Sequence, residues 1–183
     1  IRQRLRRELG ALVRRIGLTV VYVTHDQEEA LELSDRIVLM DEGRIVQIGT
    51  PEEVYLRPAT RYAAEFMGRA TLLPVESAAD GTLLPPAGPP LQGVTHALAP
   101  GARGAVCLRP EFVALAPADG AELQGVVRDA RFLGAVVRVA VEGPWRTVID
   151  ADVSPRDWRA LGAATGDVVG LTVAHDDLAV VAD

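Results

Sequence analysis

His25 is the residue of this sequence whose position most clearly allows chemistry. It follows an apolar run, residues 18–23 (LTVVYV), and precedes an acidic segment with helical spacing. In open α/β sheets, ligands bind in the crevice at the carboxyl ends of the strands, and a helix N-terminus attracts anions. An imidazole at such a place can donate a hydrogen bond to a phosphate oxygen. On position alone, a ligand-facing histidine and a structural histidine both remain open.

Two elements must position His25. Residues 18–23 are rich in β-branched side chains and apolar on both faces, which is typical of a central strand in a parallel sheet covered by helices. Thr24 and Gln27 have the spacing of a capping box, and acidic residues open the segment 28–33, where they favour the start of a helix. We therefore expect a buried strand, a turn that carries His25, and a helix.

Residues 37–68 continue an α/β pattern. The apolar runs 37–40 and 44–48 flank Asp41-Glu42-Gly43, which predicts a strand, a tight turn and a second strand. Thr50-Pro51-Glu52-Glu53 has the composition of a helix start. Pro58 should end that helix, and a last short helix is expected over residues 60–67.

Beyond Gly68 the pattern changes. Four prolines and a glycine between residues 85 and 90 exclude a helix there. Short β-rich runs separated by Gly, Pro or Asp then recur at 104–109, 123–132, 135–142, 145–150, 167–174 and 178–181. This spacing predicts a small all-β barrel or sandwich. We place the boundary near residue 69, which gives two domains, 1–68 and 69–183.

Composition excludes several functions for the 183 residues. A net charge of -6 and 4% aromatic residues argue against nucleic acid as a partner. All 19 basic residues are arginine, so the chain has neither a phosphate-loop lysine nor a Schiff-base lysine. A single cysteine, Cys107, excludes an internal disulfide, and its apolar strand context predicts a buried small side chain.

The other candidate residues favour structural roles. His96 and His175 have acidic neighbours, but a shared metal site is the weaker interpretation, and we assign no metal ligands. The Arg109 side chain either binds an anion or, as we expect, forms a salt bridge with Glu111 or another nearby carboxylate. Trp145 and Trp158 are expected as anchors of a core or an interface.

A longer stretch adds a family resemblance. Residues 21–58 (VYVTHDQEEALELSDRIVLMDEGRIVQIGTPEEVYLRP) closely resemble the end of the ATP-binding subunit of bacterial ABC importers. LRPE at 108–111 and RFLG at 131–134 look like motifs of the accessory β-domain found in one group of these importers. The resemblance implies a fold class of an α/β C-terminal piece of a P-loop ATPase domain over 1–68, followed by an all-β, OB-like (TOBE-type) small barrel over 69–183.

The resemblance also implies roles and partners. His25 would be the switch histidine, which contacts the γ-phosphate of ATP and positions the attacking water. ATP and Mg²⁺ would be cofactors of the full-length parent. Its partners would be permease subunits, a second ATPase subunit in a homodimer and, indirectly, a solute-binding protein. The subunit would lie peripherally on the cytoplasmic face of the cell membrane.

Several family motifs are absent from this sequence. It has no Gly-rich phosphate loop with lysine, no Leu-Ser-Gly-Gly-Gln signature and no apolar strand that ends in the metal-binding Asp and catalytic Glu. We expect all three upstream of Ile1. The 183 residues alone should therefore neither bind nor hydrolyse ATP, and no cofactor is expected for the fragment.

The short β-tail and the Pro-rich insertion resemble the ferric-iron type of importer more than the sugar type.

Two alternatives remain for the β-domain. It could act as a regulatory module that senses an oxyanion or a partner protein, as related domains do. An OB-type nucleic-acid binder is disfavoured by the few aromatic residues and the negative charge.

Overall fold

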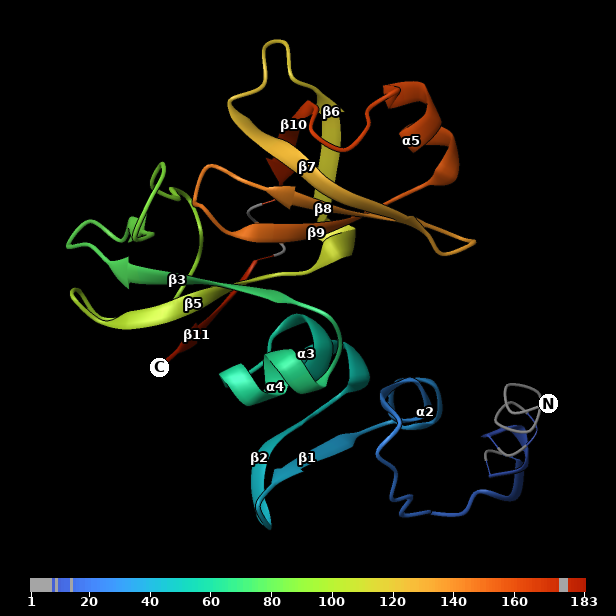
Figure 1. The fold of residues 1–183 in the computed structure, drawn as a ribbon. Helices are drawn as coiled ribbons and strands as arrows, with labels where there is room; N and C mark the ends of the chain where they lie inside the picture. Colours follow the sequence, from blue (N-terminus) through green and yellow to red (C-terminus); the bar gives the residue numbers. More distant parts are fainter. Residues whose placement is uncertain (1–7, 9, 14, 175–177) are drawn as a thin grey trace. The chain divides into compact units, whose positions relative to one another are not determined.

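The computed structural model describes residues 8, 10–13, 15–174 and 178–183. The chain divides into two compact units, Ile1–Gly68 and Arg69–Asp183, each of which is described by itself (Figure 1). Within the described part of the chain, every helix is too short or too polar to cross a bilayer. The first unit is helical with one hairpin, and the second is almost entirely β-structure.

A β-hairpin is the centre of the first unit. Strands β1 (Ile37–Asp41) and β2 (Arg44–Gly49) pair antiparallel, with Asp41 opposite Arg44. The two residues between them, Glu42 and Gly43, both have positive φ, at 46° and 78°. This is the backbone of a type I′ turn, whose twist matches that of the two strands. The predicted strand–turn–strand is confirmed.

Helices α2 (Gln27–Leu33), α3 (Pro51–Leu56) and α4 (Arg61–Phe66) accompany the hairpin. The start of α3 is the capping box that the sequence predicts. The Thr50 hydroxyl accepts from the Glu53 amide, and the Glu53 carboxylate accepts from the Thr50 amide at 2.8 Å. These hydrogen bonds from Thr50 lower the pKa of the Glu53 carboxyl group below its usual value.

Only one face of the hairpin is buried within its unit. Ile37 and Leu39 pack with Val54, Ala63 and Met67 in a small core. The opposite face exposes four apolar side chains, each 46–59% accessible: Val38, Met40, Ile45 and Ile48. An isolated two-stranded hairpin is only marginally stable in water, so the packing of Ile37 and Leu39 against α3 and α4 stabilises this one.

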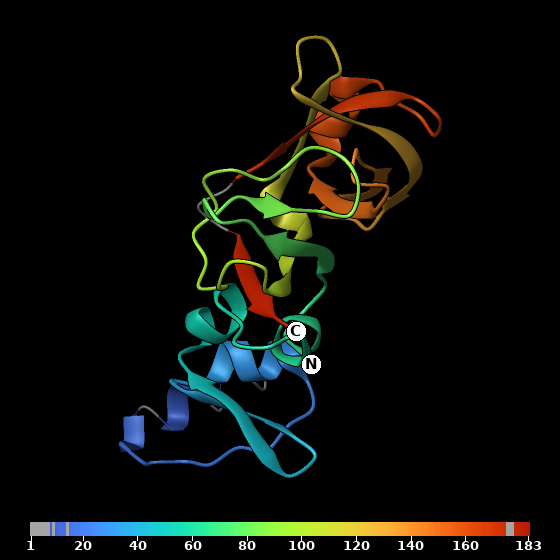
Figure 2. The same cartoon turned by 90° about the vertical axis from the view of Figure 1, so that its left-hand side faces the viewer.

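The expected buried strand over residues 18–23 is wrong for the described chain. Figures 1 and 2 show this segment as an irregular trace before α2, and it forms no strand. Its side chains are exposed, with Val21 and Val23 at 89% and 90%. The physical reason is that a strand needs a neighbour for its backbone groups, and among the described residues no strand pairs with this segment.

The second unit contains two antiparallel sheets (Figure 1). One has the order β11-β5-β3-β4, from Ala179–Ala182, Arg103–Leu108, Thr71–Ser77 and Leu83–Leu84. The other has the order β6-β10-β7-β8-β9, from Val113–Pro117, Val168–Val173, Leu123–Phe132, Val137–Glu142 and Val148–Val153. Its end strands β6 and β9 lie in contact without forming a ladder, so the sheet curls into a partly open five-stranded barrel.

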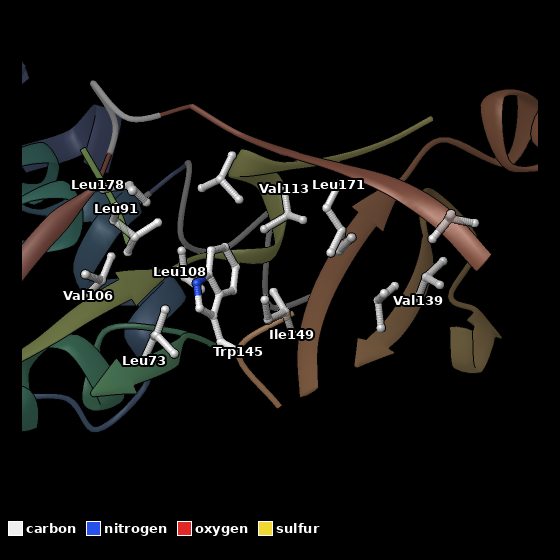
Figure 3. Packing of buried hydrophobic residues seen from close by; sticks show 14 of the residues in the cluster. Leu73, Leu91, Val106, Leu108, Val113, Val139, Trp145, Ile149, Leu171 and Leu178 are labelled. Carbon is white, nitrogen blue, oxygen red and sulfur yellow. The ribbon is translucent and has the colours of Figure 1, made fainter. Parts of the chain in front are cut away.

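A single core joins the two sheets. Figure 3 shows the Trp145 indole among Leu73, Leu108 and Ile149, with side chains of both sheets on either side. Trp145 is 3% exposed, and its Nε1–H donates to the carbonyl oxygen of Pro89 at 2.9 Å. This bond ties the Pro-rich segment to the barrel. Trp158 packs against the same core, so the expected anchoring role of both tryptophans is confirmed.

The sequence reasoning missed three strands and one α-helix of this unit. They are β3, β4, β6 and helix α5 (Pro155–Leu161). Pro74 stands inside β3, where proline normally argues against a strand, yet β3 pairs with both β4 and β5. Helix α5 has its own start signal, because the Ser154 hydroxyl accepts from the Asp157 amide.

An alanine at Gly104 is expected to destabilise the second unit by about 1–3 kcal/mol. A Cβ at this position would lie 2.3 Å from the carbonyl oxygen of Val181, on the neighbouring strand β11. The backbone of β11 would have to move away from β5. Urea unfolding followed by far-UV circular dichroism would measure the change. Ala114→Val, at an exposed position of β6, is the control; an equal loss in both variants would contradict this explanation.

Candidate functional site: the turn that carries His25

His25 lies in a bend between the extended segment 18–23 and helix α2, and its side chain is exposed. Within the described part of the chain, its ring makes no hydrogen bond. The helix that follows is capped two residues later than expected: Asp26 is the N-cap, and its carboxylate accepts from the Glu29 amide at 3.2 Å. The predicted Thr24–Gln27 box is therefore wrong, and Thr24 has another role.

Thr24 belongs to a set of four hydrogen-bonded residues, which we call the Glu29 network: Tyr22, Thr24, Asp26 and Glu29. The hydroxyls of Thr24 and Tyr22 both donate to Glu29 Oε2, at 2.8 Å and 3.0 Å. The Asp26 amide donates to Thr24 Oγ1 at 3.0 Å. His25 itself stands outside the network, but both of its chain neighbours are members.

An exposed imidazole at this turn suits a phosphate oxygen. It can donate through a ring N–H, and no hydrogen bond to described residues has to be broken first. The first turn of α2 also carries Glu28 and Glu29, so carboxylates surround the position and no second cation lies beside His25 in sequence. The remaining charge compensation that a triphosphate needs would have to come from outside this turn.

The other candidate residues lie in the second unit. Arg109 and Cys107 are 2% and 3% exposed. Burial raises the pKa of the Cys107 thiol, while nearby Arg109 opposes that shift, so the thiol stays protonated. The predicted buried cysteine is confirmed.

His96 has a structural role. Its Nδ1 accepts from the Leu98 amide at 3.2 Å, so its Nε2 carries the proton and donates to the Gly81 carbonyl oxygen at 2.9 Å. His175 lies outside the described residues. Across the ranges that the structure describes, no three His, Cys, Asp or Glu side chains gather in a way that could hold a metal ion.

The second unit matches a known family. Residues 106–181 match the TOBE domain family. In fold, it is similar to the molybdate-binding protein ModG, described as cytoplasmic and crystallised with molybdate bound. The TM-score is 0.52 at 16% sequence identity, over 60% of this chain and 94% of ModG. This likeness concerns the fold, and it agrees with the expected OB-like barrel.

Relatives with assigned functions cover both units. The sulfate/thiosulfate import ATP-binding protein CysA of Bradyrhizobium diazoefficiens is 43% identical over 93% of this chain and 48% of its own length. The spermidine/putrescine import ATP-binding protein PotA 1 of Pseudomonas aeruginosa is 37% identical over 100% of this chain and 50% of its own length. The chain is a homologue of importer ATP-binding subunits. It spans about half the length of the relatives it matches.

The homology confirms the resemblance drawn from residues 21–58 and from the β-domain motifs. A third relative, the Fe(3+) ions import ATP-binding protein FbpC of Rhizobium etli, is 41% identical over 78% of this chain and 41% of its own length. In this chain, the sequence reasoning missed Glu29 and its hydrogen bonds to Tyr22 and Thr24. The signal lay in the spacing, because a glutamate at the third helical position can reach residues that precede the helix.

Proposed function

We propose that these residues are the C-terminal half of an ABC importer ATP-binding subunit, which couples ATP hydrolysis to solute uptake. In this proposal, residues 1–68 are the last part of an α/β P-loop ATPase domain and residues 69–183 its accessory β-domain. The observation that carries the proposal is the exposed turn at His25 within a chain that is homologous to import ATP-binding proteins over nearly its whole length.

His25 is the residue we assign to ATP. Its ring would donate a hydrogen bond to a γ-phosphate oxygen and orient the attacking water. Bound ATP supplies the phosphoryl group, with Mg²⁺ to balance its charge. The chain provides no lysine for the phosphates, so these residues alone are expected to show no turnover.

The exposed apolar surface of the first unit supports the proposal that another half of the subunit packs on it. The apolar side chains of residues 18–23 and of the exposed hairpin face form a surface that is typical of an interface with another part of a protein. The exposed hairpin face consists of Val38, Met40, Ile45 and Ile48. We propose that the other half of the subunit covers them. We call a chain of about the relatives' length, in which the present residues keep their numbers, the longer subunit.

Hydrogen exchange tests this arrangement. In the 183-residue chain, the amides of residues 19–23 should exchange rapidly, because they belong to no ladder. In the longer subunit the same amides should be strongly protected, while protection in the barrel strands stays unchanged. The longer subunit should also hydrolyse ATP. Rapid exchange of residues 19–23 in both proteins, or an inactive longer subunit, would contradict the proposal.

Partners and location follow from the same proposal. The subunit would pair with a second copy and contact permease subunits at the cytoplasmic face of the membrane, with a solute-binding protein as an indirect partner. The relatives are named for sulfate or thiosulfate, for spermidine and putrescine, and for Fe(3+) ions. The FbpC relative is 41% identical over 78% of this chain, and the CysA relative is 43% identical over 93%, so these similarities do not favour ferric iron and that expectation stays a prediction.

A further inference from the structure

The Glu29 network does more than begin a helix. In a capping box, the carboxylate at the third helical position accepts from the amide of the cap residue, as Glu53 does from Thr50 at 2.8 Å in this chain. In α2 the Asp26 amide donates instead to Thr24 Oγ1. The Glu29 carboxylate reaches past the helix to two hydroxyls of the preceding segment.

The direction of these bonds is fixed by chemistry. An ionised carboxylate can only accept, so Tyr22 and Thr24 must both donate their hydroxyl protons to Glu29. Thr24 Oγ1 then offers its lone pairs to the Asp26 amide, and the bond lengths agree with this assignment. Hydrogen bonds to an ionised acceptor are about twice as strong as neutral ones.

The geometry holds the main chain on both sides of His25. Thr24, just before it, is tied to Glu29, and Asp26, just after it, is tied to Thr24 and to the Glu29 amide. The His25 ring projects from a turn whose two ends are bound to the same helical residue. Such a turn limits where the imidazole can be before any ligand arrives.

We propose that Glu29, acting through Thr24, is a positioning residue for His25. This inference rests on the proposed function, in which His25 meets the terminal phosphate of ATP. Glu29 does not touch the nucleotide. Its contribution is to keep the His25 turn in one conformation, so that the ring reaches the phosphate without first being ordered.

The conformation of the turn can be tested on the 183-residue chain without ATP. Backbone ¹⁵N relaxation should give His25 an order parameter of about 0.85, typical of rigid backbone. In Glu29→Ala and in Thr24→Val, it should fall below about 0.6. Thr24→Ser keeps the hydroxyl and should retain the rigid value. Glu28→Ala removes the same charge from the same helical turn and is the matched control. An unchanged order parameter in Glu29→Ala would overturn the proposal.

Turnover by the longer subunit supplies the second test. Glu29→Ala and Thr24→Val should each lower kcat about 10- to 100-fold with little change in the KM for ATP, because the ring is misplaced while the nucleotide still binds. The double variant should be no slower than the worse single variant, since one network is broken in each. Thr24→Ser keeps the hydroxyl and should retain the turnover of the unsubstituted subunit.

The outcomes separate the two claims. If His25→Ala abolishes turnover while Glu29→Ala and Thr24→Val match the unsubstituted subunit, the positioning role is wrong and the proposed function stands. If His25→Ala has no effect, the proposed function is wrong, and the positioning role falls with it even where the relaxation data confirm a rigid turn.

Discussion

ATP turnover by the longer subunit is expected to fall about 10²- to 10³-fold when His25 is replaced by alanine, the usual cost of removing one donor to a developing charge. The ring of His25 is exposed at the bend before α2, and its neighbours are held by the Glu29 network. Its loss removes an interaction that strengthens as charge develops on the transferred phosphoryl group. kcat and kcat/KM should therefore fall together. Steady-state phosphate release would measure both.

Two further variants make this expectation specific. His25→Gln keeps one N–H donor and should retain more turnover than His25→Ala. His96→Ala removes a histidine whose ring is used within the second unit, by Gly81 and Leu98, and should leave turnover unchanged. Equal losses in His96→Ala and His25→Ala would show a general effect on folding and contradict a direct role for His25.

The sequence predicted the local structure around His25 and Thr50, where residues a few positions apart decide it. A histidine just before a helix, acidic residues in the first helical turn and a Thr-Pro-Glu-Glu helix start are all determined by residues a few positions apart. The hairpin turn at Glu42-Gly43 follows the same logic, because its positive φ values favour glycine.

The sequence failed where the outcome depends on partners far along the chain. Residues 18–23 have the composition of a buried strand, but composition does not supply the neighbouring strands that such a segment needs. Pro74 argued against a strand that does form, because β3 pairs with both β4 and β5 in spite of the proline. The Glu29 network also escaped prediction, because Glu29 is the third helical residue only with Asp26 as the N-cap, two residues after the expected Thr24.

Replacing Trp145 with alanine is expected to destabilise the second unit by about 3–5 kcal/mol. Trp145 is 3% exposed within the core that joins the two sheets, among Leu73, Leu108 and Ile149 (Figure 3). Alanine would leave a cavity between two sheets that cannot both close over it, because each is fixed by its own ladders. Urea unfolding followed by far-UV circular dichroism would measure the loss.

Trp145→Phe separates packing from hydrogen bonding. Phenylalanine fills most of the cavity but cannot donate to the Pro89 carbonyl oxygen, which the Trp145 indole reaches at 2.9 Å. The loss should be about 1–3 kcal/mol, the cost of leaving a half-buried acceptor without its indole donor plus a smaller cavity. Hydrogen exchange should rise around Leu91, which lies two residues after Pro89 and pairs with Leu83 of β4. If Trp145→Phe is as destabilised as Trp145→Ala, the hydrogen bond carries the effect, and the indole's main contribution is to hold the Pro-rich segment on the barrel.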